Sequence, residues 1–258
     1  MQAKWAIITG ATAGIGWATA EELAHAGYSL ILIGRRADRL KELRDTLIRK
    51  VAHQTRKQEF KSIAIDITKK SELDDFIQSE GPTINKVSVL VNNAGLAKGT
   101  DKFQDAKVSD WDQMLDTNVK GLIFLTRGVL PYMIKGKAGH IVNIGSVAGR
   151  WVYPGGAVYC ASKFAVRALS EGMRMDLAGT GIRVTNIEPG MVNTEFSLVR
   201  FGDSEKASQV YSGMTPLGAK DIAETILWCL QRPQHVNIQE LVIYPTDQAA
   251  IGQVVRRP

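Results

Sequence analysis

The sequence has few cysteines and no long hydrophobic run, and each absence excludes a class of protein. Cys160 and Cys229 are the only two cysteines among 258 residues, which excludes a disulfide-rich secreted scaffold. No apolar run approaches the roughly 20 residues of a membrane-spanning helix, and residues 1–10 lack the charged start of a signal peptide. We therefore expect a cytoplasmic protein that has no membrane partner.

The excess of charge of one sign is modest. A net charge of +6 would by itself permit nucleic-acid binding. However, the densest basic stretch, residues 35–61, also contains Asp38, Glu42, Asp45 and Glu59, which is typical of a solvated helix face of mixed charge. The four histidines are not spaced as metal ligands. We expect neither a nucleic-acid partner nor a catalytic metal.

Short β-branched runs alternate with longer helical patterns along the chain. Seven runs predict strands, at residues 5–9, 29–33, 62–65, 87–91, 140–144, 183–187 and 240–244. Helical patterns lie between them, at residues 15–26, 38–55, 71–79, 111–135, 156–178 and 220–231. Several of the strands are almost continuously hydrophobic, as in sheets buried on both faces. The pattern predicts an α/β fold, a Rossmann-like doubly wound parallel sheet of about seven strands with helices on both faces.

One stretch breaks this alternation. Residues 190–218 contain no clear strand and hold glycine, proline and aromatic residues. Long loops inside compact domains are usually functional. We predict that residues 1–258 form a single domain, in which residues 190–218 are a lid over the substrate.

Three glycines, Gly10, Gly14 and Gly16, follow the first predicted strand and precede a helix. Glycine lets the backbone turn tightly and approach a pyrophosphate, and the start of the helix offers free N–H groups. The spacing differs from the usual Gly-x-Gly-x-x-Gly dinucleotide motif, and a turn that is merely rich in glycine is the alternative. The context of strand, loop and helix favours a phosphate site.

The second predicted strand ends at Gly34-Arg35-Arg36, with no acidic residue to bind the ribose hydroxyls of NAD. Positive charge is unfavourable just before a helix, so a local structural reason for the two arginines is weak. An arginine at this place commonly binds the 2′-phosphate of NADP. The pattern favours NADP over NAD, the alternative being two solvated surface arginines.

Tyr159 and Lys163 are four residues apart in a helical pattern and therefore share one face of it. A free tyrosine has a pKa of about 10, and a nearby ammonium lowers such a pKa by roughly 1–3 units. Ser146, just after the fifth predicted strand, could hold a substrate oxygen against the phenol. Tyrosine and lysine pairs at this spacing often serve stability alone. Together with the glycine motif, they favour proton transfer beside a nucleotide cofactor.

These motifs resemble those of the short-chain dehydrogenase/reductase family. The matching residues run in the family's order from residue 9 to residue 190: the glycine motif, Asn92-Asn93-Ala94-Gly95, Asn118, Ser146, Tyr159-x-x-x-Lys163 and Pro189-Gly190. The resemblance implies an enzyme with a catalytic tetrad of Asn118, Ser146, Tyr159 and Lys163. In that scheme Tyr159 is the acid and base, Lys163 lowers its pKa and binds the ribose, and Asn118 holds a water. It also implies a homotetramer.

The same resemblance, with the glycine and arginine arguments above, gives a set of expected contacts to NADP. They are Gly10, Thr12, Gly14, Ile15, Gly16, Arg35, Arg36, Asp66, Ile67, Asn92, Ala94, Gly95, Tyr159, Lys163, Pro189, Gly190, Val192 and Thr194.

Residues 148–150, 153–156, 194–200 and 244–249 resemble a narrower branch, the NADP-dependent 3-hydroxy acid dehydrogenases. These act on serine, allo-threonine and related acids such as 3-hydroxypropionate. A guanidinium binds a carboxylate through two parallel hydrogen bonds. We therefore hypothesise that Arg150 grips the substrate carboxylate and that Arg200, in the lid, assists, while Ser146 and Tyr159 hold the reacting oxygen. A surface arginine or an ion pair at a subunit interface is the alternative for each arginine.

Three other functions stay open. A 3-oxoacyl-carrier reductase would use the basic charge to attract an acidic carrier protein. A general reductase of ketones or quinones would not need Arg150. An NADP-binding protein without turnover is opposed by the complete tetrad.

Overall fold

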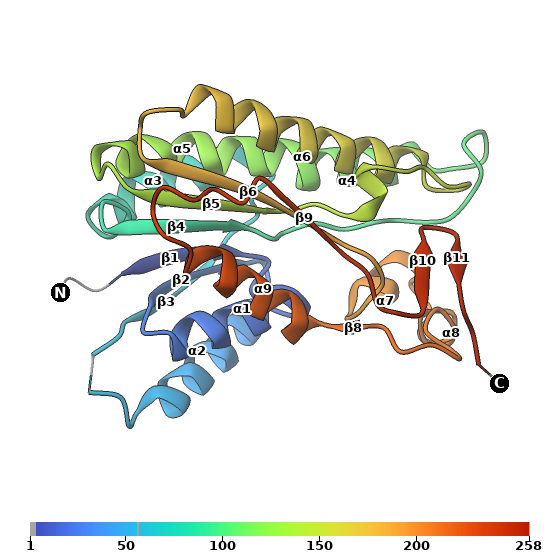
Figure 1. The fold of residues 1–258 in the computed structure, drawn as a ribbon, viewed down its shortest axis with the longest axis horizontal. Coiled ribbons are helices and arrows are strands. Elements are labelled where there is room, and N and C mark those ends of the chain that lie inside the picture. The colour runs from blue at the N-terminus through green and yellow to red at the C-terminus, as the bar shows by residue number, and fades with distance from the viewer. Residues whose placement is uncertain (1–3, 56, 258) are drawn as a thin grey trace.

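The computed structural model describes residues 4–55 and 57–257, and a seven-stranded parallel sheet lies at its centre (Figure 1). The strand order is β3-β2-β1-β4-β5-β6-β9. The strands are β1 (Trp5–Thr9), β2 (Ser29–Gly34), β3 (Phe60–Ala64), β4 (Val87–Asn92), β5 (Gly139–Ile144), β6 (Ile182–Pro189) and β9 (Glu240–Ile243). The order reverses between β1 and β4. Ligands of doubly wound sheets bind at such a reversal, beyond the carboxyl ends of the strands.

Helices cover both faces of the sheet (Figure 1). On one face lie α1 (Gly14–His25), α2 (Ala37–Val51) and α9 (Ala219–Leu230). On the other lie α3 (Lys70–Ile84), α4 (Val108–Leu115), α5 (Leu122–Lys135) and α6 (Ala157–Asp176). A π-helical turn, η1 (Asp116–Gly121), joins α4 to α5.

The strands are hydrophobic on both sides because each side has its own core. In β1, Ala6 and Ile8 belong to the cluster beneath α1, α2 and α9, whereas Trp5 and Ile7 belong to the cluster beneath α3 and α5. All four side chains are at most 2% exposed. This double burial gives β1 its continuous apolar run in place of an alternating one.

The fold predicted from the sequence is confirmed, with differences in detail. All seven predicted strands are present. The helix predicted over residues 111–135 is divided by η1. The prediction that residues 190–218 contain no strand is wrong, because β7 (Val192–Asn193) pairs with β8 (Leu217–Gly218). That stretch also contains α7 (Phe196–Phe201) and α8 (Ser204–Gln209).

Two smaller elements are absent from the prediction. A short 3-10 turn, η2 (Val147–Gly149), follows β5, and a hairpin of β10 (Gln248–Ala250) and β11 (Gln253–Val254) lies near the carboxyl end of the chain. Within residues 4–55 and 57–257, no helix is both long and apolar enough to span a membrane.

Candidate active site

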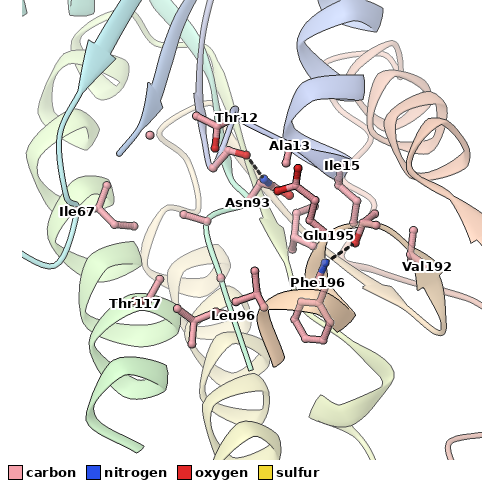
Figure 2. Close-up of a pocket in the computed structure, with 18 of the residues that line it drawn as sticks. Thr12, Ala13, Ile15, Ile67, Asn93, Leu96, Thr117, Val192, Glu195 and Phe196 are labelled. Atoms are coloured by element: carbon pink, nitrogen blue, oxygen red, sulfur yellow. Dashed lines mark hydrogen bonds between the residues drawn. The ribbon is translucent and has the colours of Figure 1, made fainter. Parts of the chain in front are cut away.

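A cavity of about 420 Å³ opens at the carboxyl ends of the strands, where the strand order reverses. Figure 2 shows Ile67 and Thr117 on one side of it and Ile15, Glu195 and Val192 on the other. Sixteen of the eighteen residues expected to bind the cofactor line this cavity; the exceptions are Gly16 and Asn92. Sequence reasoning missed several other lining residues, among them Ala13, Asn93, Leu96, Thr117, Glu195, Phe196 and Val199.

The glycines of the first turn each have a structural reason. Gly10 and Gly14 have φ angles of +64° and +52°, which L side chains rarely adopt. A Cβ on Gly16 would lie 2.3 Å from the Gly10 carbonyl oxygen, so Gly16 lets α1 approach the loop although it does not line the cavity. The α1 N-terminus has no side-chain cap and no acidic residue in its first turn, which leaves its N–H groups for a bound anion.

Asn92 lies beneath the cavity floor and is only 4% exposed. Its Nδ2 donates to Thr126 Oγ1 at 2.9 Å and to Asn143 Oδ1 at 2.8 Å, which ties β4 to β5 and α5. Asn93 lines the cavity instead and donates to the Thr9 carbonyl at 2.9 Å. Asn92 therefore has a structural role between β4, β5 and α5 and does not line the cavity, and its contact with the cofactor stays a prediction.

Arg35 and Arg36 lie at the cavity rim in different environments. The Arg35 side chain is 69% exposed and reaches Asp66 only at 4.0 Å, so its guanidinium remains accessible to an anion. Arg36 donates to Thr12 Oγ1 at 3.0 Å and to the Thr12 carbonyl at 3.2 Å. It also pairs with Glu195, in residues 190–218, at 3.0 Å. The pair connects the end of β2 to that stretch at the cavity.

Tyr159 and Lys163 project from α6 into the cavity. Lys163 Nζ donates to the Ile144 carbonyl at 2.8 Å and lies 6.0 Å from the centre of the Tyr159 ring. Burial lowers the pKa of Lys163 to about 8. Burial also raises the pKa of Tyr159, although Ser146 and the charge of Arg200 act in the opposite direction. The sequence predicts that Lys163 lowers this pKa, but the net direction is upward, which favours the protonated phenol.

Ser146 lies between β5 and the η2 turn. Its Oγ accepts from the Ala148 N–H at 3.1 Å, which caps the η2 turn, and Ser146 lines the same cavity as Tyr159. A Cβ on the preceding Gly145 would lie 2.5 Å from Asn186 Oδ1. This tight packing fixes the end of β5 and therefore the position of Ser146.

Asn118 lies in the π-helical turn and is 2% exposed. Its side chain binds both backbone groups of Leu96, at 2.8 Å and 2.9 Å, and donates to Ser162 Oγ at 3.0 Å. A Cβ on Gly95 would lie 3.2 Å from Asn118 Oδ1 and 3.5 Å from Lys163 Nζ. Asn118 and Lys163 thus lie close together behind Gly95, while Asn118 itself does not line the cavity.

The structure contradicts the hypothesis that Arg150 grips the substrate. Arg150 lines neither described cavity, and its guanidinium pairs with Glu188 and Glu240. The Glu188 carboxylate is fully buried, and Arg167 pairs with Glu240 at 3.0 Å beside it. The ion-pair alternative therefore applies to Arg150, although the pair lies within the chain.

Arg200 lies in the wall of a second cavity, of about 370 Å³, which shares Tyr159 with the first. Its guanidinium donates to Tyr153 Oη at 3.0 Å and to the Gly99 carbonyl at 3.2 Å. The Gly99 N–H donates in return to the Arg200 carbonyl at 3.1 Å. Helix α7 is thereby attached to the loop after β4, and the Arg200 cation lines the same cavity as the Tyr159 phenol.

Known proteins match the chain along most of its length. A model of the short chain dehydrogenase family matches residues 4–202. Sulfoacetaldehyde reductase 2 of Chromohalobacter salexigens is 46% identical over 245 residues, 94% of each chain. The NADP-dependent 3-hydroxy acid dehydrogenase YdfG of Salmonella typhimurium is 44% identical over 253 residues, 97% of this chain and 98% of that protein.

Solved structures agree with these matches. The closed form of serine dehydrogenase complexed with NADP+ superimposes with a TM-score of 0.90 at 41% identity, over 98% of this chain and all of that one. A serine dehydrogenase structure from Escherichia coli gives a TM-score of 0.80 at 38% identity, over 95% and 99% of the two chains. The chain belongs to the short-chain dehydrogenase family and is an NADP-dependent oxidoreductase that acts on hydroxyl groups.

Proposed function

We propose that the enzyme interconverts a small 3-hydroxy acid, such as serine, allo-threonine or 3-hydroxypropionate, and its carbonyl form. The observation that supports this most is the place of Arg200, beside Tyr159 in a cavity that both residues line. Its charge acts on the Tyr159 phenol. An acid group bound by Arg200 would hold the substrate hydroxyl near Tyr159, and the similarity to a 3-hydroxy acid dehydrogenase supports the same substrate class.

The residues around the first cavity fit NADP. The left-handed turns at Gly10 and Gly14 and the uncapped start of α1 suit a pyrophosphate, and the exposed Arg35 suits a 2′-phosphate. Pro189, Gly190, Val192 and Thr194 are the proposed contacts of the nicotinamide half. When bound, NADP supplies or accepts the hydride.

Tyr159 moves the proton in this proposal. Its raised pKa keeps the proton on the phenol, which donates it to a carbonyl oxygen during reduction. For oxidation of an alcohol, the phenol first passes this proton to the relay and then accepts the proton of the alcohol. Ser146 holds the same oxygen, and Lys163, fixed on the Ile144 carbonyl, keeps an ammonium near the phenol and the ribose. Asn118 is proposed to hold the water that relays the proton, close to Lys163 Nζ.

A sulfonate is a second candidate for the acid group. A guanidinium can also donate hydrogen bonds to the oxygens of a sulfonate, and one relative at 46% identity is named a sulfoacetaldehyde reductase. The two candidates share one enzyme mechanism and differ only in what Arg200 binds.

The test is a panel of substrates with NADP+ and with NAD+, followed by the absorbance of the reduced cofactor. It includes L-serine, L-allo-threonine, 3-hydroxyisobutyrate, 3-hydroxypropionate, 2-hydroxyethanesulfonate and a plain secondary alcohol. Turnover of the carboxylic acids with NADP+, well above the alcohol, supports the proposal. Preference for the sulfonate supports the second candidate. Turnover of the alcohol alone indicates a general carbonyl reductase. If no compound of the panel is turned over, carrier-bound acyl groups are the next substrates to test.

We also propose that the chain is one domain, residues 1–258, with residues 190–218 as its substrate lid, and that it acts in the cytoplasm as a homotetramer. The surface formed by α4 and α5 supports an assembly, because Leu115, Ile123, Phe124 and Ile134 are each at least 36% exposed on it. Light scattering of the purified protein would give the number of subunits directly.

A further inference from the structure

The segment after β9, residues 245–257, runs beside the lid (Figure 1). In that view β10 and β11 lie next to α7 and α8. No described residue of this segment lines either described cavity. Any effect of the segment on the reaction must therefore act through the lid.

Gln248 contacts the start of the lid. Its side chain is 4% exposed, its Oε1 accepts from the Met191 N–H at 2.8 Å, and its Nε2 donates to the Ala250 carbonyl at 3.3 Å. A Cβ on Gly190 would lie 2.4 Å from Gln248 Oε1. Gln248 is thus packed directly against the backbone that follows Pro189.

The neighbouring Asp247 contacts the other end of the lid. It is 4% exposed, and its Oδ2 accepts from the Thr215 N–H at 2.8 Å. Its Oδ1 accepts from Arg257 Nη2 at 2.8 Å, and the Arg257 N–H donates to the Gly213 carbonyl at 2.7 Å. The carboxyl-terminal segment therefore fixes both ends of residues 190–218 through adjacent side chains.

Gln248 binds a residue whose two chain neighbours line the cavity. These neighbours are Gly190 and Val192, and Met191 between them donates its N–H to Gln248. The Gly190 N–H donates to the Ile243 carbonyl at 2.7 Å. Two acceptors on the side away from the cavity thus hold the backbone of residues 190 and 191 in place. One of them is the Gln248 side chain, which a substitution can remove.

We propose that Gln248 is a positioning residue that holds residues 189–192 in place for the nicotinamide half of NADP. The inference rests on the proposed placement of that half against Pro189, Gly190 and Val192. A misplaced turn would weaken the binding of NADP+ without affecting the adenosine half, which lies at the glycine turn and Arg35.

The first experiment measures the binding of two ligands to Gln248→Met, by titration calorimetry. NADP+ contains the nicotinamide half, whereas adenosine 2′,5′-bisphosphate does not. We expect the Kd of NADP+ to rise about tenfold, which corresponds to ~1.4 kcal/mol, and the Kd of the bisphosphate to stay unchanged. The matched control is Gln58→Met. Gln58 also holds backbone groups, the carbonyls of Ala24 and Tyr28, but it lies at the opposite edge of the sheet.

The second variant separates positioning from simple packing. A protonated glutamic acid offers the same donor and acceptor as glutamine, whereas a carboxylate would repel the Ala250 carbonyl. Gln248→Glu should therefore approach the wild-type affinity for NADP+ as the pH is lowered from 8 to 5, relative to wild type at each pH, and Gln248→Met should not.

Three outcomes would overturn the inference. One is unchanged NADP+ affinity in Gln248→Met. Another is an equal loss of affinity for both ligands, which would indicate a general effect on the fold. The third is the absence of any pH-dependent recovery in Gln248→Glu. Equal affinity of the wild type for NADP+ and the bisphosphate would instead refute the placement of the nicotinamide half on which the inference rests.

Discussion

The cavity has two walls that are held in place in different ways. The sheet wall consists of the strand ends and α6, which hold Ser146, Tyr159 and Lys163 through backbone ladders and buried helix packing. The lid wall, residues 190–218, contains two helices of six residues each and strands of two residues. It is fixed mainly by side chains from distant segments.

The contacts of the lid wall illustrate this. Gln248, Arg200 and the Arg36–Glu195 pair each join it to an element that is not its neighbour in a sheet. Within the lid wall itself, Tyr211 donates to the Val192 carbonyl at 2.7 Å. The difference implies that substitutions in the sheet wall should change chemistry or stability, whereas substitutions in the lid wall should change KM.

The largest effect is expected from Tyr159→Phe, which removes the proton donor of the sheet wall. General acid–base catalysis contributes about 10²–10⁴-fold, so kcat should fall by about three orders of magnitude. The ring remains to fill its buried place beside Phe196. Initial rates and a fluorescence titration with NADPH check this. A normal Kd with the strongly lowered kcat is expected, and a variant that retains more than a tenth of the activity would remove Tyr159 from its catalytic role.

Arg150→Met should next affect stability and not substrate binding. It would leave the fully buried Glu188 carboxylate without its main cation. Removing one partner of a buried ion pair costs about 3–5 kcal/mol, and the partial exposure of Arg150 places the expected loss near the lower value. At roughly 2–4 °C per kcal/mol for a chain of this size, the Tm should fall by about 6–12 °C.

The same variant tests whether Arg150 takes part in substrate binding. The KM for the acid substrate should stay within about twofold of wild type at a temperature where both proteins are folded. A large rise in KM with an unchanged Tm would return Arg150 to the substrate site.

Arg200→Met is the corresponding change in the lid wall. Loss of a charge-assisted hydrogen bond to the acid group costs about 1.5–3 kcal/mol, so KM for the acid should rise about 10–100-fold. Turnover of the plain alcohol should change little, which is the internal control. Thermal unfolding of the variant should match wild type closely, because the Arg200 side chain is only partly buried. Equal losses on acid and alcohol would assign Arg200 to holding the lid alone.

The two arginines also show how far the sequence could lead. Both fitted the same hypothesis, since each lies near a catalytic motif in the chain. The pairing of β6 with β9 places Glu188 and Glu240 next to Arg150. The two glutamates follow Arg150 by 38 and by 90 positions in the sequence, so no local pattern reveals the contact. Likewise, whether Asn92 or Asn93 faces the cavity depends on where β4 ends.

The strands and the glycine turn were predictable because their causes are local. Continuous hydrophobic runs indicate burial on both faces, and a glycine is required wherever φ is positive or a backbone approaches closely. The lid and the carboxyl-terminal hairpin lack such a signal. Their short elements are held by Gln248, Asp247 and Arg200, whose side chains bind distant backbone groups.

The smallest expected effect is a loss of folding stability at low pH, caused by His140 on β5 of the sheet wall. Its ring is 2% exposed, and Nε2 lies 2.7 Å from Thr185 Oγ1. The Thr185 hydroxyl donates to the Ile238 carbonyl at 2.6 Å, so His140 Nε2 must be the donor of the first bond. Its Nδ1 has no hydrogen-bond partner within the described residues, so a second proton would be buried without an acceptor.

Burial and the nearby Arg183 lower the pKa of His140 from 6.5 to about 3. The unfolded chain therefore takes up a proton below about pH 6.5 that the folded chain refuses, so the stability is complete above that pH and is lost as the pH falls toward 3. At pH 5.5 the loss should be about 1.4 kcal/mol. Urea unfolding at pH 7.5 and 5.5 measures it, and His140→Gln, which keeps the donor to Thr185, should lose that much less. Identical pH dependence in the two proteins would show that His140 is not the group responsible, and that acid affects the two walls through other side chains.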